Sequence, residues 1–135
     1  MDEYQIITDF GCDLPLHIAE ERNIEVIPME VFIEGEEPKK GSEVDVYEFY
    51  QKLREKKVAK TSAVSIDAFV TAFTAHLEKG EDIVYVALSS GLSGTYNMVR
   101  LVCQEYQSME TFVLDTRNIS FGSGVFALLA AHWIA

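Results

Sequence analysis

Apolar residues follow two alternating patterns along the chain, short uninterrupted runs and stripes spaced three or four residues apart. Runs of this kind predict buried strands, and the stripes predict amphipathic helices. The predicted strands are residues 4–9, 25–33, 83–88 and 112–114, with an exposed polar connection predicted at residues 34–41 and a small-residue turn at residues 120–124. The predicted helices are residues 14–22, a segment from Asp45, residues 66–77, a segment with the stripe Met98, Val99, Val102 and Tyr106, and a segment from Val125 onward.

The alternation of strands with helices predicts βαβ units and an α/β fold with a mostly parallel sheet flanked by helices. The run 83–88 is rich in β-branched residues, which is typical of a central parallel strand covered on both faces. Asp45 and Ser65 are predicted to cap the helices that follow them, and Gly80 is predicted to end the second of these. We expect residues 1–135 to form one domain.

The last predicted helix is apolar on nearly every side and reaches Ala135 without a capping residue. We therefore expect a truncated domain, and a final helix that is exposed and able to mediate self-association. The segment 125–135 is too short to span a bilayer, so we expect no stable insertion into a membrane.

The charge balance excludes several classes of partner. The formal net charge of −11 opposes binding to nucleic acids and to anionic membrane surfaces.

The two cysteines, Cys12 and Cys103, lack the spacing of a metal site, which indicates reduced thiols in a cytoplasmic protein. No third ligand accompanies Asp9 and Asp13, so we expect no metal ion.

Polar residues gather near the ends of several predicted strands, where open α/β sheets bind their ligands. The segment 89–95 is the strongest candidate, because its two glycines allow close approach of the backbone and a helix N-terminus follows. It suits a carboxylate or a phosphate, and it fits a hydroxyl-capped turn equally well. Thr61 and Ser62 form a second candidate pair, whereas Asp9 and Asp13 more often form local hydrogen bonds.

The chain departs from common catalytic motifs at particular residues. The segment 91–95 places its second glycine one position too early for the G-x-S-x-G motif of a serine hydrolase. No Gly-Lys-Ser/Thr sequence follows the glycines, which excludes a P-loop. His76 lies on an apolar helical stripe, which favours a core or boundary histidine over a catalytic base. We expect a binding protein and not an enzyme.

The order of the polar clusters resembles the DegV family, the fatty-acid-binding subunits of bacterial fatty acid kinase. The segments that carry the resemblance are Ile-Ile-Thr-Asp with Cys12-Asp13-Leu14-Pro15, Ile27-Pro28-Met29, Lys60-Thr61-Ser62, Leu88-Ser89-Ser90-Gly91-Leu92-Ser93-Gly94-Thr95-Tyr96-Asn97, and Leu114-Asp115-Thr116 with Ser120 and Gly122-Ser123-Gly124. The Leu-Ser-Ser-x-Leu-Ser-Gly-Thr-Tyr string is highly specific, and the segments together span nearly the whole chain.

The resemblance implies a two-lobed α/β protein that buries a long-chain fatty acid, such as palmitate, with its tail in an apolar tunnel. It implies that Thr61 and Ser93 hold the carboxylate and that a separate fatty acid kinase subunit makes the acyl-phosphate. The site residues expected on this basis and from the loop chemistry are Thr61, Ser93, Ser62, Ser90, Gly94, Thr95 and Asp9. No cofactor is expected.

Three features depart from the family pattern. Phe10 follows Asp9 where the family has a serine, the segment 61–65 lacks the proline of the family motif, and the family is roughly twice as long as this chain. An alternative of another class stays open at this point, a phosphoryl-transfer or sugar-phosphate-binding domain that uses the segment 89–95. A phosphate site requires Lys or Arg side chains converging on that loop, whereas a lipid site requires a deep apolar cavity.

Overall fold

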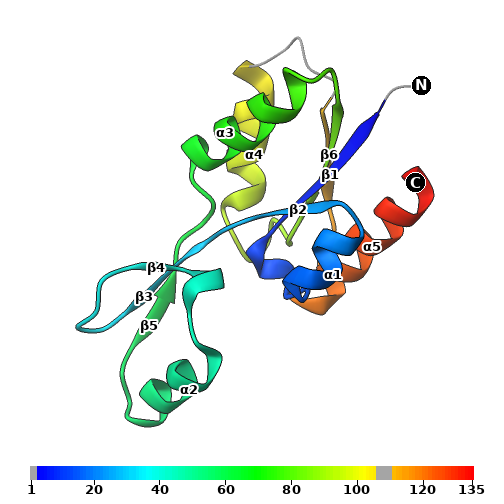
Figure 1. Ribbon diagram of the computed structural model, residues 1–135. Coiled ribbons are helices and arrows are strands. Elements are labelled where there is room, and N and C mark those ends of the chain that lie inside the picture. Colours follow the sequence, from blue (N-terminus) through cyan, green and yellow to red (C-terminus); the bar gives the residue numbers. More distant parts are fainter. Residues whose placement is uncertain (1–2, 106–110) are drawn as a thin grey trace.

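The computed structural model describes residues 3–105 and 111–135, and it contains a four-stranded parallel sheet (Figure 1). The strands in spatial order are β2 (Ile24–Ile27), β1 (Tyr4–Asp9), β6 (Asp82–Ala87) and β7 (Thr111–Asp115). All neighbouring pairs are parallel, which confirms the predicted fold class and the central position of the run 83–88. Tyr106, the last residue of a predicted helical stripe, lies outside the described residues.

Helices cover both faces of this sheet and enclose two apolar cores. Helices α3 (Ile66–Leu77) and α4 (Thr95–Glu105) pack on one face, and α1 (Leu16–Glu21) and α5 (Phe121–Ile134) lie on the other (Figure 1). The first core includes Phe69, Phe73 and Tyr85, whose rings meet edge-on or tilted. Successive residues of β1 enter opposite cores, because side chains alternate across a strand. The two central strands, β1 and β6, are thus covered on both faces, whereas the edge strand β7 exposes Phe112 and Leu114.

A second, smaller sheet was not predicted. It is antiparallel, in the order β4 (Lys39–Lys40), β3 (Glu30–Ile33) and β5 (Ala59–Thr61), and α2 (Val46–Arg54) lies beside it (Figure 1). The prediction of one strand over residues 25–33 is wrong, because Pro28 cannot donate a ladder hydrogen bond and the chain leaves β2 to enter β3 in the other sheet. The chain after β3, predicted as an exposed connection, contains β4 and a 3₁₀ turn at Gly41–Glu43.

The predicted N-terminal helix caps are confirmed. Asp45 accepts a hydrogen bond from the Glu48 amide at 2.8 Å, and Ser65 accepts one from the Ala68 amide at 3.2 Å. The C-cap of α3 is Glu78 and not Gly80, which follows two residues later with a φ of 79°. Two helix boundaries also shift. Helix α1 begins two residues later than predicted, so that Pro15 is its N-cap and not part of its first turn.

Helix α5 begins at Phe121, and the small residues predicted as a turn before it form its first turn. Gly124 is required there because the helix passes the turn Phe10–Cys12 closely. A Cβ at Gly124 would lie 2.8 Å from the Cys12 carbonyl oxygen and 3.0 Å from Leu14.

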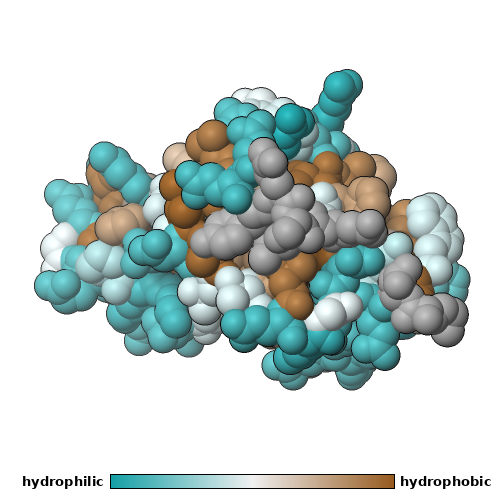
Figure 2. Space-filling view, turned by 90° about the horizontal axis from the view of Figure 1, so that it is seen from above, coloured by the Kyte–Doolittle hydropathy of each residue, from teal (hydrophilic) through white to brown (hydrophobic). Residues whose placement is uncertain are grey.

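Apolar side chains remain exposed at several places on the surface. Figure 2 shows them gathered in patches on the face seen from above in Figure 1. Helix α5 exposes Phe121, Val125, Phe126, Leu129 and Trp133, and Trp133 is 76% exposed. This exposure agrees with the expected character of the final helix, and self-association through it stays a prediction. In the ranges 3–105 and 111–135, no helix has both the length and the apolar character to cross a membrane.

Candidate functional site

A cavity of about 590 Å³ lies where the carboxyl ends of the parallel strands meet the small antiparallel sheet. Its wall comes from the loops that follow β1, β6 and β7 and from strands β3 and β5. The residues that line it are Phe10, Gly11, Asp13, Met29, Val31, Thr61, Ser62, Ala63, Leu88, Leu92, Ser93, Gly94, Ile119 and Ser120. The position is the one at which open parallel sheets bind ligands.

Backbone hydrogen bonds fasten the three loops of the parallel sheet to one another. The Ser89 amide donates to the Asn118 carbonyl at 2.7 Å, and the Ser120 amide donates to the Gly11 carbonyl at 2.9 Å. The Ser62 amide donates to the Glu30 carbonyl at 3.1 Å, which fixes the end of β5 against β3. These bonds hold the cavity wall in place before any ligand enters.

Four of the seven expected site residues line this cavity together. Thr61 and Ser62 come from the end of β5, and Ser93 and Gly94 come from the loop before α4. The two hydroxyl clusters lie about thirty positions apart in the sequence, and the fold brings them to one wall. The other three expected residues, Asp9, Ser90 and Thr95, are absent from the lining among the residues that the structure describes.

Ser90 is occupied by a neighbouring loop. Its hydroxyl donates to Asp115 at 2.6 Å and its amide donates to the same carboxylate at 3.2 Å. The hydrogen bond from the Ser90 hydroxyl is the main cause that lowers the pKa of Asp115. Ser90 therefore connects the loops that follow β6 and β7.

Asp9 is fully buried beneath the cavity wall. Its carboxylate accepts hydrogen bonds from the Tyr85 hydroxyl at 2.8 Å and from the Gly11 amide at 3.0 Å. Burial raises the pKa of Asp9, and the bond from Tyr85 opposes that rise. This arrangement positions the turn at Gly11, which does line the cavity.

Thr95 is also fully buried, and it contacts both parts of the hydroxyl-bearing wall. Its Oγ1 accepts a hydrogen bond from the Val64 amide at 3.3 Å and lies 3.0 Å from the Ser93 Oγ. The Thr95 amide donates to the Ser93 Oγ at 3.2 Å. The hydroxyl of Ser93 is thus surrounded by Thr95 on the side away from the cavity.

Apolar side chains form half of the cavity lining, and the sequence did not single most of them out as site residues. They are Phe10, Met29, Val31, Ala63, Leu88, Leu92 and Ile119. Phe10 also lines a neighbouring hollow of about 260 Å³ beneath α2, with Asp13 and Val31 common to both. The Phe10 ring lies against Gly41, where any Cβ would collide with it.

The cavity wall carries little charge. Asp13 is the one charged side chain among the described lining residues, and it is exposed. Among the side chains of residues 3–105 and 111–135, no group of His, Cys, Asp or Glu is arranged to hold a metal ion. The hydrogen-bonding capacity of the wall therefore comes from hydroxyl and backbone groups.

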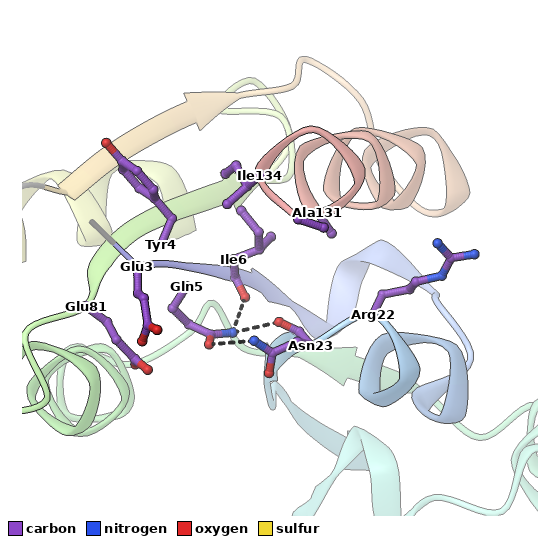
Figure 3. A pocket seen from close by; sticks show the side chains of 10 residues that line it. Glu3, Tyr4, Gln5, Ile6, Arg22, Asn23, Glu81, Ala131 and Ile134 are labelled. Carbon is purple, nitrogen blue, oxygen red and sulfur yellow. Dashed lines mark hydrogen bonds between the residues drawn. The ribbon is translucent and has the colours of Figure 1, made fainter. Parts of the chain in front are cut away.

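A second hollow, of about 430 Å³, lies at the opposite end of the parallel sheet (Figure 3). It is bordered by the first residues of β1, the end of α1 and the end of α5. The Gln5 side chain within it already donates to the carbonyls of Ile6 and Asn23, at 2.9 and 2.8 Å. Because the Gln5 amide is already paired and the hollow lies at the amino ends of the strands, we do not regard it as the ligand site.

His76 is the boundary histidine that the sequence predicted. It is 9% exposed, and its two ring nitrogens are hydrogen-bonded to Glu25 and Glu81, each at 2.5 Å. It lies on α3, away from the cavity lining.

Comparisons with known proteins agree on one family. Residues 3–135 match the family described as "Uncharacterised protein, DegV family". A DegV domain-containing protein of Clostridium perfringens is 33% identical over 135 residues, which are 99% of this chain and 48% of the relative. This chain thus spans about half the length of the curated relatives it matches.

Two solved structures share the fold closely. A DegV family protein from Thermus thermophilus, described as fatty acid binding, has a TM-score of 0.88 and 28% identity. The alignment covers 98% of this chain and 47% of that one. DegV from Bacillus subtilis, described as a fatty acid binding protein, has a TM-score of 0.86 and 26% identity over 99% of this chain and 48% of its own.

Proposed function

The chain belongs to the DegV family, and from this premise we propose that it binds a long-chain fatty acid, such as palmitate, in the cavity between its two sheets. The observation that carries the proposal is that Thr61 and Ser93 lie on one wall of a cavity whose remaining lining is largely apolar. The two solved relatives described as fatty acid binding support it, because they share this fold over nearly the whole chain.

The hydroxyl-bearing wall suits a carboxylate headgroup. Hydrogen bonds to an ionised oxygen contribute about 1.5–3 kcal/mol each. Thr61 and Ser93 each offer a hydroxyl, and Ser62 adds a third beside them. The first amides of α4 lack partners within the helix and lie close to Gly94. A carboxylate can therefore be held here without a lysine or an arginine.

The apolar wall suits the acyl chain. Each buried methylene contributes about 0.8 kcal/mol, so the tail supplies most of the affinity and the headgroup supplies orientation. The hollow beneath α2 continues the apolar surface past Phe10, toward Phe49 and Tyr50. We propose this direction for the tail.

The cavity favours a lipid over a phosphate ligand. A phosphate site requires cationic side chains to converge on the segment 89–95, and the described lining contains no Lys or Arg. A sugar phosphate would also leave the apolar side chains of the wall in contact with polar groups. The phosphoryl-transfer alternative is therefore the weaker one.

We further propose that the bound acid is presented to a separate fatty acid kinase and that this chain supplies binding and orientation, not the chemistry. The family resemblance supports this step. The position of Ser93 in a loop whose neighbours Gly91 and Leu92 are exposed is consistent with access to the headgroup from outside.

The test is palmitate binding measured by titration calorimetry, together with lipid extraction and mass spectrometry of the purified protein. We expect Thr61→Ala and Ser93→Ala each to weaken palmitate binding by roughly tenfold or more, the equivalent of one charge-assisted hydrogen bond. Ser90→Ala is the matched control, because Ser90 belongs to the same loop and bonds to Asp115 instead of lining the cavity. Unchanged affinity in both the Thr61 and Ser93 variants would refute the proposed site.

A further inference from the structure

Thr95 makes two hydrogen-bond contacts with the Ser93 hydroxyl. A serine hydroxyl has two lone pairs and one hydrogen to donate. The Thr95 amide donates to the Ser93 Oγ at 3.2 Å. The Thr95 Oγ1 lies 3.0 Å from the same atom.

Either hydroxyl can be the donor in the contact between them. The Thr95 Oγ1 also accepts a hydrogen bond from the Val64 amide at 3.3 Å. An ionised oxygen in the cavity is a stronger acceptor than the Thr95 hydroxyl, so it takes the hydrogen of Ser93. The hydrogen of Thr95 is then left for the Ser93 Oγ, which accepts on its buried side and donates toward the cavity.

We infer that Thr95 is a positioning residue for the carboxylate site and not a ligand to the fatty acid: it holds the Ser93 hydroxyl as a donor toward the headgroup. Thr95 is fully buried and absent from the described cavity lining, so it acts through Ser93. Its bond to Val64 also fixes the chain that follows Thr61 and Ser62. The inference rests on the proposed function.

The test compares Thr95→Val, which keeps the shape and removes the hydroxyl, with Thr95→Ser, which keeps the hydroxyl. We expect Thr95→Val to weaken palmitate binding roughly tenfold, on the scale of one hydrogen bond to a charged group. We expect Thr95→Ser to stay within about threefold of the unaltered protein. Binding of hexadecanol, which has the same tail and no carboxylate, is expected to change much less in Thr95→Val.

A double-mutant cycle separates positioning from general structural support. If Thr95 acts through Ser93, adding Thr95→Val to Ser93→Ala produces no further loss of palmitate affinity. An equal loss in both backgrounds, or an equal loss of hexadecanol binding, would show a structural role and overturn the inference. Circular dichroism and thermal melting of each variant establish that the comparison is made on folded protein.

The outcomes also separate this inference from the proposed function. If Ser93→Ala weakens palmitate binding and Thr95→Val does not, the inference is wrong and the carboxylate site stands. If neither Thr61→Ala nor Ser93→Ala affects palmitate binding, the proposed function is wrong and the inference falls with it.

Discussion

The buried hydrogen bond between Tyr85 and Asp9 gives a stability prediction with a defined size. Tyr85→Phe removes one hydroxyl, which donates to the Asp9 carboxylate at 2.8 Å. The Phe ring keeps the contacts of the tyrosine ring with Phe69 and Phe73. The loss is therefore a single hydrogen bond to a buried carboxyl group, and we expect the free energy of unfolding to fall by about 1.5–3 kcal/mol at pH values where Asp9 is ionised.

The cost of Tyr85→Phe is expected to depend on pH in one direction. Burial raises the pKa of Asp9 in the folded protein above its ordinary value, while the Tyr85 hydroxyl works against that rise. Between the two values the folded state binds more protons than the unfolded state, so the stability contributed by Asp9 is full at low pH and is lost as the pH rises through the folded pKa. Removing the hydroxyl raises the folded pKa further, and the cost is largest where Asp9 is ionised.

Urea unfolding at a pH close to the ordinary pKa of an aspartate and at a pH well above it measures this dependence. We expect a larger difference between Tyr85→Phe and the unaltered protein at the higher pH. The control is the same substitution in an Asp9→Asn background, where only a neutral hydrogen bond is lost and the cost falls to about 0.5–1.5 kcal/mol. An equal cost in both backgrounds and at both pH values would contradict the assignment of Asp9 as the partner that matters.

Three further predictions follow from individual contacts. Gly124→Ala is expected to lower the free energy of unfolding by about 1 kcal/mol, because steric overlap with the Cys12 carbonyl outweighs the gain in helix propensity. The control is Gly91→Ala, whose Cβ would make only an ordinary van der Waals contact. It should change the free energy of unfolding by less than about 0.5 kcal/mol in the same denaturation experiment. Ser65→Ala removes the cap of α3 and should cost about 1 kcal/mol, seen as a lower melting temperature. Phe10→Ala should widen the passage from the main cavity to the hollow beneath α2 and shift the binding preference from palmitate toward longer acids such as stearate, and an unchanged preference in competition binding would count against Phe10 as the residue that narrows this passage.

The parallel sheet and its helix caps could be predicted because their signals are local. The run 83–88 is apolar at every position, and this pattern is typical of a central strand that is buried on both faces of a parallel sheet. Ser65 is followed by an apolar stripe with helical spacing, so its role as the N-cap of α3 could be predicted from the sequence. The small sheet had no such signal, because β4 is two exposed lysines whose pairing with β3 is decided by the tertiary structure. The sequence predicts a turn at Gly124 and not a helix. The helix requires a glycine there because Cys12 approaches closely, and Cys12 is distant in the sequence.

The candidate site could be predicted only in part from residue chemistry. The segment 89–95 has the composition of an anion-binding loop, and the cavity does include Ser93 and Gly94. Nothing in the sequence distinguishes Ser90 and Thr95 from Ser93, because all three are small hydroxyl residues in one loop. The fold separates them by direction: Ser90 turns to Asp115, Thr95 is buried, and Ser93 reaches the cavity.

The overall charge explains why the cavity needs an apolar wall more than it needs strong anion binding. A protein with a formal net charge of −11 repels a free fatty acid anion at long range, and exposed Asp13 adds to this at the cavity itself. Salt screens such repulsion beyond about 8 Å at physiological ionic strength. Burial of a long acyl chain, at about 0.8 kcal/mol for each methylene, outweighs the residual repulsion, and short carboxylic acids lack enough methylenes to do so. On the proposed function, the hydroxyls of Thr61 and Ser93 act on an acid that the apolar wall has already selected, so tail length is expected to be the first determinant of binding and the headgroup the determinant of orientation.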